Sequence, residues 1–237
     1  MAAENRGLSR LILLIAVSLL LPGCLEKGEK QSSPQLVQGN IGGHNVYIPK
    51  SYINMRYTSV GSESVLIQAW YPGDKVVPGD PDALWRKKQW YKNVRILASW
   101  YPHPASMTRI LDTQLTLTRA TQVVGVEYDL VHQTQPTGII SDRDDLWIDN
   151  NSGQPTVIIG CSHLENTAHI PHVPQCKEQI LSGNYHIQVG YDRRLLPRWR
   201  RVHDHVLSLL NSFNSPQSAS AYFKTVTEQP LQQEENP

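Results

Sequence analysis

The sequence predicts an α+β fold, with a mainly antiparallel sheet and a C-terminal amphipathic helix packed on it. Short apolar runs separated by Gly, Pro, Asn and Asp recur between residues 45 and 191, as in strands joined by turns. An Asn-Asn-Ser-Gly turn lies between two such runs and indicates a hairpin. After Pro197, apolar residues recur at helical spacing.

The strands are predicted from composition and alternation. The first run ends at Pro49, and the second ends before a Pro-Gly-Asp turn. In a later run, Val124 and Val126 alternate with Gly125 and Glu127, which is the period of a strand. We expect strands over residues 45–48, 64–71, 93–101, 114–118, 122–131 and 185–191, and a hairpin of residues 145–149 and 155–161.

The predicted helix follows the last strand. Pro197 suits a first helical turn, because the N–H that proline lacks has no helical partner there. Apolar side chains then recur at a spacing that places them on one face. We expect this stripe to lie on the sheet and the arginines to face outward. The stripe comprises Trp199, Val202, Val206, Leu209 or Leu210, and Phe213.

Residues 1–23 have the order of a bacterial export signal. Arg6 and Arg10 precede an apolar run that is too short to span a membrane comfortably. The run ends in Leu-Pro-Gly-Cys24, which resembles the lipobox of bacterial lipoproteins. The resemblance implies that Cys24 carries lipid and anchors the chain on the periplasmic side of the envelope; the alternative is a plain thiol. The next residue, Leu25 rather than Asp, implies the outer membrane.

Composition divides the mature chain into three parts. Residues 24–39 are polar and predict a flexible tether, residues 40–214 are the expected globular domain, and residues 215–237 predict a disordered tail. Cleavage after residue 23 removes two of the 22 basic and one of the 21 acidic residues, which leaves 20 of each. This neutral balance argues against a nucleic-acid partner, which needs a basic face.

Cys161 and Cys176 remain once Cys24 is lipidated. Export places them in an oxidising compartment, where a disulfide is the default. The alternative is a zinc site that also uses His163, His169 and His172, but the spacing matches no common zinc finger. The sequence therefore favours the disulfide, and it predicts neither a metal nor another cofactor.

Three further patterns leave alternatives open. The acidic cluster Asp142, Asp144, Asp145 and Asp149 is a solvated turn or, less readily, a calcium site. A basic run from Arg193 to Arg201 faces solvent, or meets acidic lipid or an acidic partner. Aromatic residues near 85–101 belong to the core or to a protein interface, where Trp, Tyr and Arg dominate the energetics. The candidate partner-binding residues are Trp85, Arg86, Trp90, Tyr91 and Tyr101.

The searched hydrolytic and nucleotide-binding motifs are all incomplete, which lowers the expectation of catalysis. Several short sequence patterns occur along the chain in the same order as in a known class of lipoprotein. They are Asn40-Ile41-Gly42-Gly43, Ala69-Trp70-Tyr71-Pro72-Gly73-Asp74, Cys161-Ser162, Pro174-Gln175-Cys176, Val189-Gly190-Tyr191 and Leu195-Leu196-Pro197-Arg198-Trp199. Over residues 40–213 the chain resembles the immunity lipoproteins that accompany type VI secretion phospholipase effectors.

That resemblance implies a protein that is not an enzyme and is monomeric when free. It would bind a type VI lipase effector in the periplasm and block its active-site entrance. The first alternative is a solute-binding or envelope-assembly lipoprotein without a toxin partner, which predicts a concave apolar pocket. The second is a periplasmic enzyme, which predicts a histidine, an acid and a nucleophile in one cleft.

Overall fold

The computed structural model describes residues 33–53, 63–71, 76–78, 89–103, 105–136, 145–150, 153–162 and 175–228, without the side chain of Trp90. Most of the folded part belongs to one compact unit, Pro34–Pro237. The expected export signal and Cys24 lie outside the described residues. Within those residues, no helix has the length and apolar character needed to cross a membrane.

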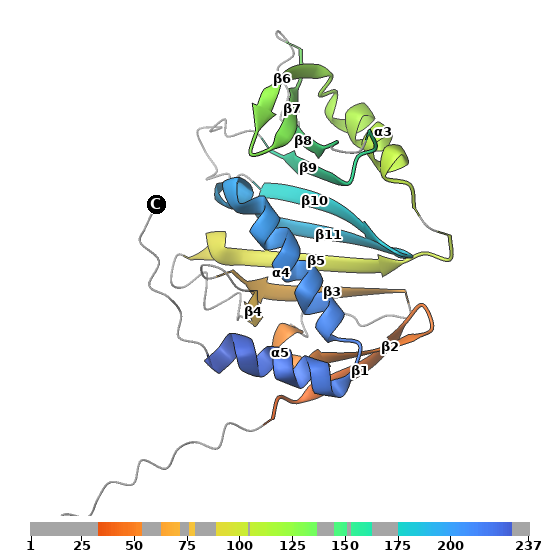
Figure 1. The fold of residues 1–237 in the computed structure, drawn as a ribbon, viewed down its shortest axis with the longest axis vertical. Coiled ribbons are helices and arrows are strands. Elements are labelled where there is room, and N and C mark those ends of the chain that lie inside the picture. Colours follow the sequence, from red (N-terminus) through yellow and green to blue (C-terminus); the bar gives the residue numbers. More distant parts are fainter. Residues whose placement is uncertain are drawn as a thin grey trace, which may run out of the picture. The chain divides into compact units, whose positions relative to one another are not determined.

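A nine-stranded antiparallel sheet forms the centre of this unit (Figure 1). Its spatial order is β4-β3-β5-β11-β10-β9-β8-β7-β6, so the fold class predicted from the sequence is confirmed. The bounds are β3 Ser64–Trp70, β4 Val77–Pro78, β5 Asn93–Trp100, β6 Gln122–Glu127, β7 Leu130–Thr134, β8 Asp145–Asp149, β9 Val157–Cys161, β10 Gln175–Ser182 and β11 Tyr185–Asp192. Short 3₁₀ turns are η1 Lys50–Tyr52, η2 Trp90–Lys92 and η3 Arg193–Arg198.

A separate hairpin precedes the sheet. Strands β1 (Leu36–Ile41) and β2 (His44–Pro49) pair antiparallel, and Gly42 and Gly43 make the turn with φ angles of 60° and 85°. Such positive φ angles favour glycine, which has no Cβ to clash with the backbone. The expected tether over residues 24–39 is therefore too long at its C-terminal end: regular structure begins at Leu36, whose side chain packs against the main core.

Helix α4 (Trp199–Ser212) crosses one face of the sheet (Figure 1). Its predicted apolar stripe is buried, and the exposed arginines lie on the other side, as expected. Pro197 differs from the prediction because it belongs to η3, two residues before α4 begins. The buried stripe residues are Trp199, Val202, Val206, Leu209 and Phe213, all with the main core.

Helix α3 (Met107–Thr118) covers the opposite face at β8 and β9, where it closes a second, smaller core. Residues 114–118 were expected to form a strand, and this expectation is wrong. Thr116 and Thr118 favour strands in isolation, but their hydroxyls bond to carbonyls one helical turn back. Ile110 and Leu115 lie on the face that packs against the second core.

The segment 122–131, expected to be one strand, is instead a hairpin of β6 and β7. Tyr128 and Asp129 form its two-residue turn with φ angles of 55° and 63°. Two residues with positive φ suit the twist of a tight hairpin, although Asn and Gly are the usual occupants. The absence of those residues explains why the turn was not predicted.

The segment 215–237, expected to be disordered, contains helix α5 (Pro216–Glu228). Ala219 and Val226 are buried, and Tyr222 and Phe223 pack against the main core. These four residues recur at helical spacing within a polar composition, so averaging over the whole tail hides the apolar stripe. Residues 229–237 lie outside the described residues.

Candidate functional site

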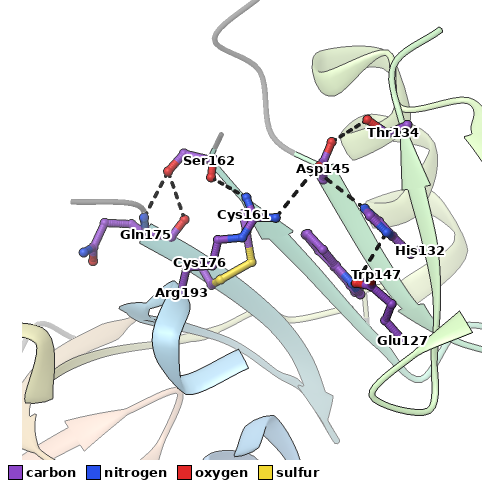
Figure 2. A network of polar contacts seen from close by, with 10 residues as sticks. All are labelled: Glu127, His132, Thr134, Asp145, Trp147, Cys161, Ser162, Gln175, Cys176 and Arg193. Carbon is purple, nitrogen blue, oxygen red and sulfur yellow. Dashed lines mark hydrogen bonds and ion pairs between the residues drawn. A yellow bond between two sulfur atoms is a disulfide. The ribbon is translucent and has the colours of Figure 1, made fainter. Parts of the chain in front are cut away.

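A disulfide joins Cys161 on β9 to Cys176 on β10, which are directly paired across the two strands (Figure 2). Next to it, the backbone N–H of Ser162 donates to the Gln175 carbonyl at 3.0 Å, and the Gln175 N–H donates to Ser162 Oγ at 3.0 Å. The disulfide and these two hydrogen bonds hold Ser162 and Gln175 side by side, at the two ends of the segment that joins β9 to β10. His163, His169 and His172 lie within that segment, outside the described residues.

Asp145, at the start of β8, is buried rather than part of a solvated turn. Thr134 Oγ1 donates to Asp145 Oδ1 at 2.7 Å. Arg193 Nη2 lies 3.8 Å and His132 Nε2 lies 3.6 Å from Asp145 Oδ2. A buried carboxylate needs such partners, because the charge is costly in an apolar environment. The sequence did not show these partners, since Arg193 lies far along the chain.

Trp147 is the centre of this polar cluster. Its indole stacks on the His132 ring, with centroids 4.3 Å apart and planes 9° from parallel, and the Arg193 guanidinium carbon lies 5.0 Å from its ring. Figure 2 shows the indole between the other two side chains. Trp147 Nε1 donates to Glu127 at 3.2 Å, and Arg193 Nη1 donates to the Ser162 carbonyl at 2.9 Å. The cluster thus connects the β6–β7 hairpin to the disulfide.

A second polar pair lies between the sheet and α4. Glu178 on β10 is fully buried, and its Oε1 lies 2.6 Å from His203 Nδ1. Burial raises the pKa of Glu178. For His203, burial lowers the pKa, but the hydrogen bond and charge of Glu178 outweigh it, so the pKa is raised. The pKa of Tyr191 is also raised, most strongly by burial and next by the neighbouring Glu178.

His203 also lines an open hollow of about 370 Å³ between α4 and strands β8 to β10. This volume is at the low end for ligand pockets, and the lining mixes charged and apolar side chains rather than forming an apolar cavity. Ser182 lines the same hollow, but within the described residues no hydrogen bond joins it to His203.

Among the described residues, no three His, Cys, Asp or Glu side chains are grouped closely enough to hold a metal ion. Asp145 and Asp149 are both buried in β8, and the described contacts of Asp145 are to protein side chains.

The structure separates two of the predicted partner-binding residues. Tyr91 lies in η2 immediately before β5, under the Arg194 guanidinium at 4.3 Å, whereas Tyr101 follows the far end of β5 and is 45 % exposed. A strand of this length is about 26 Å long, so the two tyrosines do not share one small patch. Trp85, Arg86 and the side chain of Trp90 lie outside the described residues.

Sequence reasoning missed an exposed apolar group on the β6–β7 hairpin. Val123, Val124 and Val126 are 60 %, 59 % and 71 % exposed, and Tyr128 at the turn is 44 % exposed. The signal was present in the Val-Val-Gly-Val run, but a strand pattern does not tell which face another element covers.

No protein-family model and no curated protein matches this chain. Among solved structures, the fold is similar to that of Smlt3025, an immunity protein of the Stenotrophomonas maltophilia type IV secretion system. The TM-score is 0.53 at 15 % identity, over 74 % of this chain and 90 % of that one. The iron-regulated outer membrane lipoprotein FrpD of Neisseria meningitidis aligns with a TM-score of 0.48 at 13 % identity, over 75 % and 93 % of the two chains.

Proposed function

We propose that this chain is an immunity protein that binds and neutralises a toxic effector delivered by a secretion system. The observation that carries the proposal is the fold, which the chain shares with the secretion-system immunity protein over 74 % of its length. The local sequence patterns that resemble immunity lipoproteins support the same function independently.

The architecture suits inhibition by tight binding. A nine-stranded sheet with helices on both faces, a disulfide and the Trp147 cluster brace the described part of the domain. A preorganised surface loses little conformational entropy when it binds, so more of the contact energy appears as affinity. Inhibition of this kind needs no catalytic group in the inhibitor.

The finer proposal concerns the partner and the place. We infer that the effector is a type VI phospholipase of the lipase class and that the chain, monomeric when free, blocks its active-site entrance. Lipidation at Cys24 would hold the chain on the periplasmic side of the outer membrane. Tethering raises the local concentration at the surface where a phospholipase must act. Trp85, Arg86, Trp90, Tyr91 and Tyr101 remain candidate contact residues.

Co-expression tests the proposal. Any lipase encoded by a gene next to the gene for this chain is targeted to the periplasm of a sensitive host, with and without the full-length chain. We expect the host to die when the lipase is alone and to survive when the chain is present. A catalytically inactive lipase is the control for toxicity unrelated to phospholipid hydrolysis. Equal killing with and without the chain would refute the immunity function.

A second arm tests the anchor separately. The variant Cys24→Ser retains the folded domain but lacks the acceptor for lipid. We expect it to move from the membrane fraction to the soluble periplasmic fraction and to need higher expression for equal protection. If Cys24→Ser leaves membrane association unchanged, the chain is not anchored by lipid at Cys24. The co-expression experiment still tests effector binding in that case.

A further inference from the structure

Strands β3, β5, β11 and β10 have one apolar face and one polar face. Ile67, Ile96 and Val189 lie in one row across the apolar face, and all three are buried in the main core. Successive residues along a strand point to opposite sides, so the residues between them form the second face. We call this second face the polar face. It comprises Ser64, Leu66, Gln68 and Trp70 on β3, Asn93, Arg95, Leu97 and Ser99 on β5, His186, Gln188, Gly190 and Asp192 on β11, and Gln175, Lys177, Gln179 and Leu181 on β10.

The polar face is open in the part of the chain that the structure describes. Helix α4 packs on the apolar side, in the main core. Helix α3 lies on the same side as the polar face, but it packs against Leu146, Ile148 and Ile158 on β8 and β9. Arg95 and Lys177 are exposed, and most other members of the polar face are half-buried. Another molecule can therefore reach these strands from this side.

Arg95, Gly190 and Lys177 form one row in the polar face. Gly190 on β11 is paired with Arg95 on β5 and with Lys177 on β10. Adjacent strands are about 4.8 Å apart, so the backbones of the two cationic residues are about 10 Å apart. A Cβ added at Gly190 would lie 3.8 Å from Arg95 Nε and 3.9 Å from Arg95 Nη2, so the guanidinium extends beside the glycine. The two cations thus flank a position that has no side chain.

The charge of this row is not balanced by the protein. Arg95 and Lys177 form no ion pair with a carboxylate of the described residues. Asp192 is the one acid among the residues of the polar face, and it is buried and bound by Arg194 Nε at 2.9 Å. The group complementary to this row is a carboxylate, because arginine binds a carboxylate through two N–H groups and lysine attracts it as a point charge.

Tyrosines lie at both ends of the polar face. The Arg194 guanidinium that binds Asp192 lies 4.3 Å from the centre of the Tyr91 ring. At the other end, the ring of Tyr101 lies 6.3 Å from that of His186. Tyrosine and arginine are enriched in protein interfaces, whereas aspartate and glutamate are depleted. The polar face and its border thus have the composition of a protein interface.

Charge and size distinguish between the possible occupants. A second copy would present the same excess of positive charge, and like charges across an interface repel. Binding to acidic lipid usually takes clusters of about four to eight Lys or Arg, whereas this region has three, one of them bound to Asp192. Four strands of eight residues cover roughly 500 Å², and a stable complex buries about 800 Å² on each partner. Any protein partner must therefore contact the border as well, where the tyrosines lie.

We propose that the polar face is the docking surface for the effector, and that a carboxylate side chain of the effector binds over Gly190 between Arg95 and Lys177. This inference rests on the proposed function. A bond through two N–H groups of Arg95 fixes the orientation of the partner as well as attracting it. Tyr91 and Tyr101 supply apolar contact area at the two ends.

Binding measurements with the full-length lipidated chain in detergent test this inference. The probe is a catalytically inactive form of the lipase used in the co-expression experiment. The test variants are Arg95→Glu and Lys177→Glu, both at exposed positions. The matched control is Lys224→Glu, which makes the same charge change at an exposed position on α5. We expect each test variant to weaken binding at least tenfold and the control to change it less than twofold. Circular dichroism melting verifies that the variants fold.

A third variant tests the carboxylate position without changing the charge. Gly190→Val places a side chain between the two cations, and valine suits a strand. A Cβ at Gly190 makes only ordinary contacts with Arg95, so the fold accommodates it. We expect Gly190→Val to weaken binding at least threefold. The affinity of wild type should also fall more steeply than that of Arg95→Glu as the salt concentration rises from about 50 to about 300 mM.

The outcomes separate the two proposals. If the wild-type chain binds the lipase and both charge variants bind equally well, the polar face is not the docking surface, although the proposed function stands. If only Gly190→Val binds as well as wild type, the carboxylate does not lie over Gly190. If the wild-type chain neither binds the lipase nor protects the host, both proposals fail.

Two further measurements test the other occupants. If Arg95→Glu converts a dimer to a monomer in sedimentation, the occupant is a second copy. If it removes binding of Cys24→Ser to vesicles of acidic phospholipid without changing lipase affinity, the occupant is a bilayer. Either result overturns the inference.

Discussion

Removal of the His203 imidazole is expected to destabilise the domain strongly. Glu178 is fully buried, and His203 Nδ1 is 2.6 Å from its Oε1. The variant His203→Ala would leave the carboxylate without this partner, and breaking a buried ion pair in this way costs about 3–5 kcal/mol. The total stability of a domain is only about 5–15 kcal/mol. Urea unfolding followed by circular dichroism, with the disulfide intact, measures the loss.

A second substitution identifies the cause. In Glu178→Gln/His203→Ala the buried charge is absent, so about 1–2 kcal/mol of the loss should be recovered relative to His203→Ala alone. The control is His103→Ala, which removes an exposed histidine and should change stability by less than about 0.5 kcal/mol. A value for His203→Ala within about 1 kcal/mol of wild type would refute the reasoning, because the buried carboxylate would then not depend on His203.

The same pair gives the stability a pH dependence. The pKa of His203 is raised above its ordinary value of 6.5, so the native state binds the proton more tightly than the unfolded chain. This stabilisation is complete below pH 6.5 and is lost as the pH rises through the native pKa. Glu178 adds to this effect. Because its native pKa is raised above 4.5, the stability of the domain also falls as the pH rises from 4.5 through that native pKa. The advantage of wild type over Glu178→Gln/His203→Gln should therefore be larger at about pH 6 than at about pH 8.

Two further perturbations test the fold. Cys161→Ser/Cys176→Ser should lower the unfolding free energy by about 3 kcal/mol, because the disulfide closes a loop of 15 residues; urea unfolding of the purified variant measures this. Gly42→Ala should cost about 2 kcal/mol or more, because a Cβ there would overlap the Trp100 indole and the φ angle of 60° disfavours alanine. The control is Gly43→Ala, which has a positive φ angle but no neighbour within 4 Å and should cost about 1 kcal/mol; thermal unfolding compares the two.

Each of these expectations has a contradicting result. Equal urea midpoints for the double serine variant and the wild type, at equal slope, would mean that the bond does not restrict the unfolded chain. Equal melting temperatures for Gly42→Ala and Gly43→Ala would mean that the indole moves aside without cost. In that case, the close packing of the first hairpin against the end of β5 contributes nothing measurable.

Helix α4 and strands β3, β5 and β11 could be predicted because their signals are local and periodic. Trp199, Val202 and Val206 recur at helical spacing, and their burial follows directly. The hairpin of β8 and β9 was likewise marked by its own turn residues. In these segments local preference and tertiary packing agree, so one sequence suffices to recognise them.

The polar clusters could not be predicted in the same way. Asp145 and Arg193 are distant in sequence and meet only because the strand order brings the start of β8 within reach of η3, which follows β11. Strand β10, which carries Glu178, was not predicted, and nothing near Glu178 in sequence indicates the imidazole of His203 on α4. Contacts of this kind depend on the strand order, which local patterns do not specify.

The place of β11 in the sheet has a consequence for how the chain folds. β11 pairs with β5 on one side and with β10 on the other, so it is the only described strand that joins β3, β4 and β5 to β6 through β10. Because β11 is also the last strand along the described residues, a continuous nine-stranded sheet requires residues up to Asp192. During synthesis, before β11 has emerged, the strands on its two sides can form only partial sheets with unpaired inner edges, and such edges invite aggregation. Late closure by β11 should thus make the folding rate sensitive to any substitution that weakens its pairing with β5.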